Sequence, residues 1–250
     1  MIDRDHWWSP APTDVTLLHN DVHVWRASLD QQAEQLKWLA QTLAADESLR
    51  AEGFYFERDK KRFIAGRGIL RTILGRYLGI EPDQLQFFYS PRGKPTLAKT
   101  PGESTLRFNL AHSQGLALYA ITYEREIGVD LERIRHIAEA EQIVDHYFSA
   151  GEKAVFHALA EHEKHGAFFT CWTRKEAYLK ACGKGLTEAL NQIDVSLAPG
   201  EPARLLSIEG NVLEAARWSL QELRPAFGFV ATLAVEGHNW NLACWHWPTE

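Results

Sequence analysis

One charged segment in the second half of the chain limits the fold most strongly. Residues 172–186 contain no proline, are rich in helix-forming residues and run into Gly183 and Gly185, which suit a left-handed stop after a last helical turn. The segment therefore predicts a helix. Glu176 and Lys180 are four residues apart and share one face of it. Taken alone, such a pair is typical of an exposed ion pair, worth roughly a few tenths of a kcal/mol.

A second acidic group lies upstream, where apolar and acidic residues alternate over residues 127–132. On a strand, Asp130 and Glu132 project from one face, and Val129 and Leu131 from the other. Two carboxylates held together repel each other unless a cation lies between them or one is protonated. With Glu176 as a third donor, the three side chains would suit a hard ion such as Mg²⁺, and Mn²⁺ could take the same place.

Both segments together resemble the signature pair of the 4'-phosphopantetheinyl transferases. The first motif is Gly-Val-Asp-Leu-Glu at 128–132. The second, some forty residues later, is Trp172-x-x-Lys175-Glu176-Ala177-x-x-Lys180-x-x-Gly183-x-Gly185-Leu186. Arg-Gly-Lys-Pro at 92–95 and Phe-Asn-Leu-Ala-His-Ser at 108–113 also match. With the length of the chain, these matches resemble the large, single-chain Sfp-type branch, and the likeness covers about residues 50–190.

The resemblance implies an α+β fold. In that fold, two similar α/β halves pack about a pseudo-twofold axis, and the ligand binds in the cleft between them. We expect an N-terminal half at residues 1–124, on the side of the 3'-phosphate and adenine of coenzyme A. We expect a C-terminal half at residues 125–250, with the metal motifs and the catalytic helix.

The activity implied by the resemblance moves the 4'-phosphopantetheine group of coenzyme A onto a serine of an apo acyl or peptidyl carrier protein. The reaction depends on Mg²⁺ and releases adenosine 3',5'-bisphosphate. Asp130, Glu132 and Glu176 would hold the ion. Glu176, or a water on the ion, would take the serine proton. Lys180 and His112 would stabilise phosphoryl oxygens in the transition state.

A basic segment is the second candidate site. Residues 58–76 carry seven basic residues against the single acid Asp59. A solvated helix face is the usual meaning of such a charge run. A phosphate clamp is the alternative, because arginine presents a planar fork of donors. By resemblance, Arg50, Arg62 and Arg67 are the candidates for the 3'-phosphate.

Other contacts to coenzyme A are also implied by the resemblance. The turn at residues 90–95 matches a family loop that lies against the nucleotide, and His112 matches a family histidine that bonds the phosphates. Ala111 replaces the first serine of the family's Ser-His-Ser element. Lys175 is assigned to positioning or to phosphate contact. The complete set expected to bind coenzyme A is Arg50, Arg62, Arg67, Arg92, Gly93, Lys94, Pro95, His112, Ser113, Lys175 and Lys180.

Composition narrows the partners and the location. The formal net charge of -6 gives no global attraction to nucleic acid or to an anionic membrane. No apolar run approaches a membrane span, and the N-terminus has no apolar signal core. Three cysteines are an odd count without metal-site spacing, which suits a reducing cytoplasm. We therefore expect a cytoplasmic protein, and the two similar halves that the resemblance implies suit a monomer.

Two other functions remain open, and a zinc site is a further alternative. A catalytically silent coenzyme A-binding or carrier-docking protein would keep the same fold. An unrelated Mg²⁺-dependent phosphoryl-transfer enzyme is disfavoured, because no Gly-x-x-x-x-Gly-Lys-Ser/Thr loop is present. His157, His162 and His165 could suggest zinc, but their spacing does not match a helical ligand pair.

Periodicity predicts the remaining elements. Strands are expected at residues 22–29, 106–110, 116–123, 126–134, 193–197, 217–223, 227–235 and 242–247, the last four in a mostly antiparallel sheet. Helices are expected at 30–43, 58–76 and 138–148, and another should start after the capping box of Ser149 and Glu152. A turn is expected at 111–115.

Overall fold

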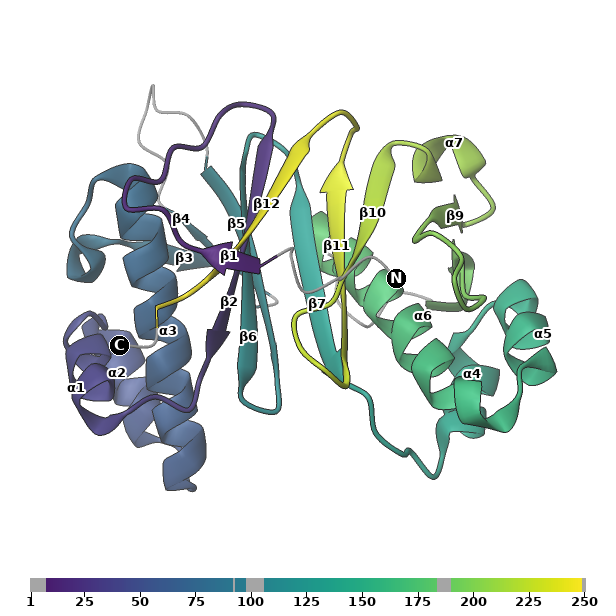
Figure 1. The fold of residues 1–250 in the computed structure, drawn as a ribbon, viewed down its shortest axis with the longest axis horizontal. Coiled ribbons are helices and arrows are strands. Elements are labelled where there is room, and N and C mark those ends of the chain that lie inside the picture. Colours follow the sequence, from purple (N-terminus) through teal and green to yellow (C-terminus); the bar gives the residue numbers. More distant parts are fainter. Residues whose placement is uncertain (1–7, 92, 98–105, 184–189, 249–250) are drawn as a thin grey trace.

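The described residues of the computed structural model, 8–91, 93–97, 106–183 and 190–248, form two larger sheets with helices on their outer sides, and two small two-stranded sheets. In the view of Figure 1, one sheet with its helices lies to the left, and the other sheet with its helices lies to the right. This arrangement confirms the α+β class. The pseudo-twofold relationship between the halves stays a prediction.

The left-hand sheet has five strands, in the order β1, β12, β2, β6 and β5. Their bounds are Trp8–Pro10 (β1), Asp21–Ser28 (β2), Leu106–Ser113 (β5), Leu116–Tyr123 (β6) and Asn241–His246 (β12). β12 runs parallel to both β1 and β2, whereas the other pairs are antiparallel. The last strand of the chain therefore lies in the sheet of the first half, although the expected division assigned all residues after 124 to the second half.

Three helices cover the outer face of this sheet (Figure 1). They are α1 (Ala33–Gln41), α2 (Ala45–Glu52) and α3 (Glu57–Leu78). The long helix α3 buries Ile69, Leu70 and Ile73 in a core shared with Trp25 and Phe108 of the sheet. A short 3-10 turn and a small hairpin follow, at Pro82–Gln84 (η2), Phe87–Tyr89 (β3) and Pro95–Leu97 (β4).

The right-hand sheet has three antiparallel strands, in the order β10, β11 and β7. Their bounds are Ile127–Arg133 (β7), Trp218–Leu223 (β10) and Phe229–Glu236 (β11). Its helices are α4 (Ala140–Tyr147), α5 (Ala150–Ala158), α6 (Glu161–Cys182) and the short α7 (Val212–Ala215). A 3-10 turn, Leu190–Gln192 (η3), and a two-stranded sheet, Ile193–Val195 (β8) and Leu205–Ile208 (β9), complete this half.

The predicted capping box at the start of α5 is confirmed. The Ser149 amide donates to the Glu152 carboxylate at 2.8 Å, and the Glu152 amide donates to the Ser149 hydroxyl at 3.3 Å. The two side chains thus satisfy backbone donors that the first helical turn leaves free.

The helix that carries the second motif is longer than expected. α6 begins at Glu161, eleven residues before the predicted start, and ends at Cys182, before Gly183, whose φ of 67° is left-handed as predicted. Residues 184–189, including Gly185 and Leu186 of the motif, lie outside the described residues, and so does Arg92.

Two sheet faces pack together at the centre of the molecule. Val129 and Leu131 of β7 share a core with Val22 and Val24 of β2 and with Leu118 of β6. These apolar side chains therefore point away from the face of β7 that carries Asp130, as the alternation predicted.

The turn between β5 and β6 is shorter than expected. β5 continues through Ser113, and only Gln114 and Gly115 lie outside both strands, with φ of 48° and 85°. Two successive positive φ values are typical of a two-residue hairpin turn. His112 consequently lies on a strand.

No helix in the described part of the chain has the length and apolar character needed to cross a membrane.

Candidate active site

Strand β7 and helix α6 touch backbone to backbone at Gly128. A Cβ atom added there would overlap the carbonyl oxygen of Ala177 and the amide nitrogen of Ala181. A larger residue would push the helix away from the strand, because these backbone atoms cannot rotate aside as a side chain can. The glycine of the first motif thus permits the contact that brings the second motif against β7.

Asp130 lies two residues after Gly128, on the same face of β7. Lys180 Nζ donates to Asp130 Oδ1 at 2.6 Å. Asp130 is buried, and its other oxygen, Oδ2, has no hydrogen-bond partner among the described residues. An unpaired buried carboxylate oxygen is costly, so this atom is suited to a cation or a donor from a ligand.

Glu176 lies one helical turn before Lys180. Its Oε1 is also buried, again with no hydrogen-bond partner in the described ranges. Burial, followed by the negative charge of Asp130, raises the pKa of Glu176 to about 7, and Lys180 opposes this rise. A carboxylate with a pKa near neutrality can exchange a proton at physiological pH.

Glu132 lies near the end of β7, and its carboxylate links this strand to Ser113 of the N-terminal half. Its Oε2 accepts a hydrogen bond from the Ser113 hydroxyl at 3.1 Å and another from Arg135 at 3.4 Å. The Arg133 amide donates to the same Ser113 hydroxyl at 3.2 Å. Glu132 therefore already has partners, unlike the free oxygens of Asp130 and Glu176.

His112 lies beside the same group, on β5. Withdrawal from water, followed by the charge of Lys180, lowers the pKa of His112 below its usual value, and Asp130 opposes the effect. The imidazole is therefore neutral at pH 7, and it can give a hydrogen bond from one ring nitrogen while the other remains an acceptor. Two of the predicted catalytic residues, His112 and Lys180, thus come together from the two halves.

The donor set fits a divalent cation in part. Two buried carboxylate oxygens without partners, together with a raised pKa at Glu176, are what a cation between Asp130 and Glu176 would relieve. Within the described ranges, no three His, Cys, Asp or Glu side chains are spaced closely enough to hold a metal by themselves. Mg²⁺ usually keeps several waters and substrate oxygens, so two carboxylates suffice for it.

Two of the arginines expected at the 3'-phosphate lie near the start of α3. Arg62 donates to both oxygens of Asp30, at 2.7 and 2.8 Å. Arg50 has no ion pair among the described residues, and its guanidinium lies 5.3 Å from the centre of the Phe63 ring. Arg50 thus keeps its donors for a ligand, whereas Arg62 already uses two of its own.

Arg67 belongs to a buried charge cluster. Glu47 accepts from Arg71 at 2.6 Å and pairs with Arg67 at 3.7 Å, so two guanidinium groups share one carboxylate. Arg67 Nη2 donates to the Tyr89 hydroxyl at 2.8 Å, while its buried Nη1 has no hydrogen-bond partner in the described part of the chain. The cluster keeps one net positive charge, which would suit a phosphate oxygen.

The predicted turn at residues 90–95 forms, but one of its side chains points to the catalytic helix. The Gly93 amide donates to the Ser90 carbonyl at 2.8 Å, and Gly93 has a φ of 80°. Pro95 begins β4. Lys94 Nζ contacts carbonyl oxygens at the end of α6 instead of facing solvent.

Lys175 fits the first of its two expected roles, positioning, better than the second, phosphate contact. Its side chain is buried, and Nζ lies 2.6 Å from the Glu152 carboxylate and 2.8 Å from the Leu190 carbonyl oxygen. These partners belong to the C-terminal half, so the ammonium ties α6 to α5 and to the residues after the second motif. This placement favours a structural role over phosphate contact.

Asn109 helps to hold β7 beside β5, and the sequence motifs did not single it out. Its Oδ1 accepts a hydrogen bond from the Val129 amide at 2.9 Å. The Ser113 hydroxyl accepts one from the Arg133 amide, and in both pairs the partners are twenty residues apart in the sequence. These two side chains thus link β5 to β7 in place of backbone–backbone hydrogen bonds between paired strands. A polar residue at a buried position of an apolar strand was the signal that could have revealed Asn109, because buried polar groups are almost always paired.

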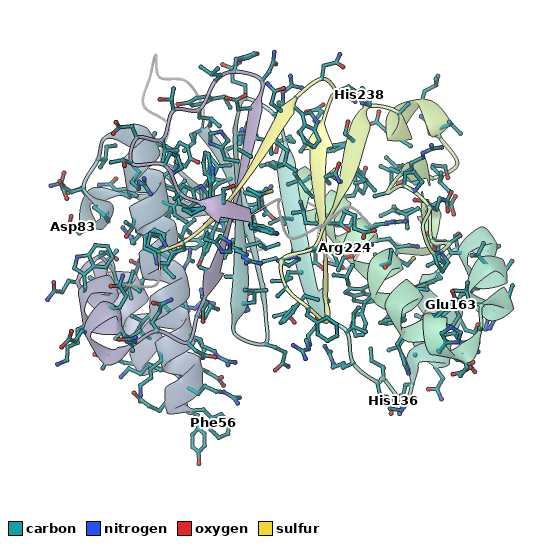
Figure 2. All side chains as sticks on the ribbon, viewed as in Figure 1. Phe56, Asp83, His136, Glu163, Arg224 and His238 are labelled. Carbon is teal, nitrogen blue, oxygen red and sulfur yellow. The ribbon has the colours of Figure 1, made fainter. Side chains whose placement is uncertain are left out.

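The histidines considered for zinc do not form a cluster with one another. His157 pairs with Asp145 at 3.3 Å, whereas His165 contacts His136 at 3.1 Å. Figure 2 shows His136 at the lower edge of the C-terminal half. Neither pair includes the third histidine of that group, His162.

Comparisons with known proteins agree with the two motifs. The family model described as 4'-phosphopantetheinyl transferase superfamily matches residues 126–234, and the model of the N-terminal part of 4'-phosphopantetheinyl transferase matches residues 24–123. The 4'-phosphopantetheinyl transferase HetI of Nostoc sp. is 47% identical over 97% of this chain and 99% of its own. A putative 4'-phosphopantetheinyl transferase of Synechocystis sp. is 38% identical over 60% of this chain and 61% of its own.

One solved structure is similar over a smaller part. The holo-[acyl-carrier-protein] synthase (AcpS) of Thermotoga maritima matches 46% of this chain and 64% of its own, at 17% identity and a TM-score of 0.34.

Proposed function

The chain belongs to the 4'-phosphopantetheinyl transferase superfamily, and from this premise we propose that it transfers the 4'-phosphopantetheine group of coenzyme A to a serine of an apo acyl or peptidyl carrier protein. Coenzyme A is the substrate that supplies the group, and adenosine 3',5'-bisphosphate is the leaving product. The observation that carries the assignment of the site is the convergence of Asp130, Glu176 and Lys180 at the contact between β7 and α6.

Asp130 and Glu176 are the residues that would hold Mg²⁺, with Mn²⁺ as an alternative ion. Their two unpartnered oxygens support this proposal. Glu132 stays the third proposed ligand, although among the described residues the three carboxylates do not lie close enough together to hold an ion by themselves. When bound, the ion would neutralise the pyrophosphate and the charge that develops on the leaving phosphate.

Glu176 is our candidate for the proton acceptor. A serine hydroxyl is a weak nucleophile at neutral pH, so its proton must move to a nearby base as the oxygen attacks phosphorus. Without the ion, burial and Asp130 raise the pKa of Glu176 to about 7; the ion would lower that pKa and so keep the carboxyl group ionised, as a proton acceptor must be. The new bond joins the serine oxygen to the phosphorus of the pantetheine arm, and the bond from that phosphorus to the bridging oxygen breaks.

Lys180 and His112 would stabilise the phosphoryl oxygens. The Lys180 ammonium is held at Asp130 and therefore sits beside the proposed ion site. His112, with its lowered pKa, would donate from a neutral ring. Fixed donors in a partly buried site stabilise developing charge without having to reorganise during the reaction.

The basic groups of the N-terminal half would bind the 3'-phosphate. Arg50 has no ion pair among the described residues, and Arg67 has one buried donor atom without a partner. Arg62 would have to share its donors with Asp30. We therefore favour Arg50 and Arg67 over Arg62 for this contact.

A cytoplasmic monomer is part of the proposal. His112 of one half lies beside Lys180 and Asp130 of the other, so a single chain supplies residues to both sides of the site. The odd cysteine count suits a reducing compartment.

The experiment incubates the protein with coenzyme A, Mg²⁺ and a panel of apo carrier proteins, and it scores the mass of each carrier. A gain equal to one phosphopantetheine group on a carrier serine is expected, together with release of adenosine 3',5'-bisphosphate. Binding of coenzyme A without any mass gain across the panel would indicate a catalytically silent binding protein instead.

A further inference from the structure

Lys94 joins the N-terminal half to the end of the catalytic helix. Its Nζ donates to the carbonyl oxygen of Lys180 at 2.6 Å and to that of Ala181 at 3.1 Å, across 86 and 87 residues of sequence. Lys180 is thus held at two points. Its carbonyl oxygen accepts from Lys94, and its ammonium donates to Asp130.

The contact supplies hydrogen-bond donors to carbonyl groups at the end of the helix. The last four carbonyl groups of a helix have no partner within the helix, and the helix dipole makes this end negative. The Gly183 amide reaches back to the carbonyl oxygens of Leu179 and Lys180. Lys94 adds a positive charge and two hydrogen bonds at the same turn, so it stabilises the end of α6 next to the site.

The loop that carries Lys94 is itself well anchored. The Lys94 amide donates to the Ser90 hydroxyl at 3.0 Å, and the Ser90 amide donates to the Lys94 carbonyl oxygen at 2.9 Å. Pro95 follows directly and pairs with Tyr89 in the β3–β4 hairpin. The ammonium is therefore presented from a fixed backbone.

The surroundings of the ammonium also favour a structural contact. Burial lowers the pKa of Lys94, although Glu126 opposes the effect. Arg107, which pairs with Glu126 at 3.3 Å, adds a like charge nearby. A cation withdrawn from water in this way needs close oxygen partners, and the end of α6 supplies them.

We propose that Lys94 is a positioning residue, which holds the last turn of α6 against the N-terminal half so that Lys180 and Glu176 keep their alignment toward Asp130. This role is distinct from the nucleotide contact expected from the resemblance, and it rests on the proposed transferase function. Small displacements of catalytic groups are costly, so loss of this contact should slow the transfer step.

Hydrogen exchange and steady-state kinetics of three variants test the proposal. Lys94→Met keeps the length of the side chain and removes its charge, whereas Lys94→Arg keeps the charge and the donors. Lys164→Met is the matched control, because Lys164 pairs with Glu141 and Glu161 at the opposite end of the same helix. Lys94→Met should exchange faster at the amides of residues 179–183, and Lys164→Met should not.

In the kinetics, Lys94→Met should lower kcat between about 10- and 100-fold, with the KM for coenzyme A changed less than about twofold. Lys94→Arg should recover a large part of the kcat. A raised KM with an unchanged kcat would instead indicate nucleotide contact and overturn the proposal, as would unchanged exchange at residues 179–183. If the unaltered protein transfers nothing to any carrier, the proposed function fails, and the exchange data still decide whether Lys94 holds the helix.

Discussion

The ammonium of Lys180 lies 2.6 Å from Oδ1 of Asp130, although fifty residues separate the two in the sequence. This ion pair marks the point where the strand motif and the helix motif meet. It leaves Asp130 Oδ2 buried and unpaired among the described residues, next to a Glu176 that is partly withdrawn from water. The proposed metal and proton chemistry therefore depends on one contact between two secondary-structure elements.

Asp130→Asn should remove the charge of this carboxylate while keeping its shape. Transfer to an apo carrier should fall about 100-fold or more, because the proposed ion and Lys180 both lose their partner. The circular dichroism spectrum should be unchanged, since Lys180 is partly exposed and can be solvated. Asp145→Asn, at an exposed pair with His157, is the control and should keep full activity.

Gly128→Ala should separate the two motifs. The added methyl group would overlap backbone atoms of Ala177 and Ala181, so α6 must move away from β7. We expect a loss of about 3 kcal/mol or more in the free energy of unfolding, measured in urea, together with loss of transfer.

The matched control is Gly166→Ala on the same helix, where a Cβ would meet no atom within 4 Å. It should be neutral or stabilising by up to about 1 kcal/mol, because alanine favours the helix. Equal effects of the two substitutions would contradict the close contact at Gly128.

Glu176 should make stability depend on pH in the absence of divalent ions. Its pKa is about 7 in the folded chain against 4.5 as the ordinary value. Between these values the folded state holds a proton that the unfolded state has released, so stability falls as pH rises, by at most about 1.4 kcal/mol per pH unit. Well above pH 7, Glu176 is ionised in both the folded and the unfolded state, so its effect on stability no longer changes with pH.

Urea unfolding at several pH values checks this expectation. The stability of Glu176→Gln relative to the unaltered protein should increase from pH 5 to pH 8, because glutamine cannot ionise. If the difference in the free energy of unfolding between the two proteins stays constant over this range, the pKa of Glu176 is not raised in the folded protein.

Lys175→Met should damage the fold more than substrate binding. It leaves Glu152 buried without its ammonium partner, although the amides of Ser149 and Val195 still donate to that carboxylate. Breaking a buried pair costs about 3 to 5 kcal/mol. Calorimetric binding of adenosine 3',5'-bisphosphate to the folded variant should be unchanged, and a strong loss of that binding would restore the phosphate contact expected from the resemblance.

The alternation of residues in β7 was sufficient to predict which face carries the carboxylates, and Gly183 was sufficient to predict where α6 ends. Both are local properties. The start of α6 at Glu161 was not predicted, because its apolar residues face more than one neighbouring element and leave no clean stripe. The position of β12 in the first sheet was not predicted either, since strand pairing over more than two hundred residues leaves no local signal.

Side-chain partners were the least predictable part of the site. Arg67 was assigned to the 3'-phosphate by resemblance and Lys175 to positioning or phosphate contact, and each also has a buried acidic partner that is distant in sequence, Glu47 and Glu152. Lys94 was expected at the nucleotide, whereas its partners are backbone carbonyl groups, which no residue pattern identifies.

Binding of Mn²⁺, followed by electron paramagnetic resonance in the presence of coenzyme A, tests the central claim most directly. The unaltered protein should bind one ion per chain, and both Asp130→Asn and Glu176→Gln should weaken that binding about tenfold or more, because each removes one carboxylate ligand. Undiminished Mn²⁺ binding in both variants would contradict a shared ion between β7 and α6.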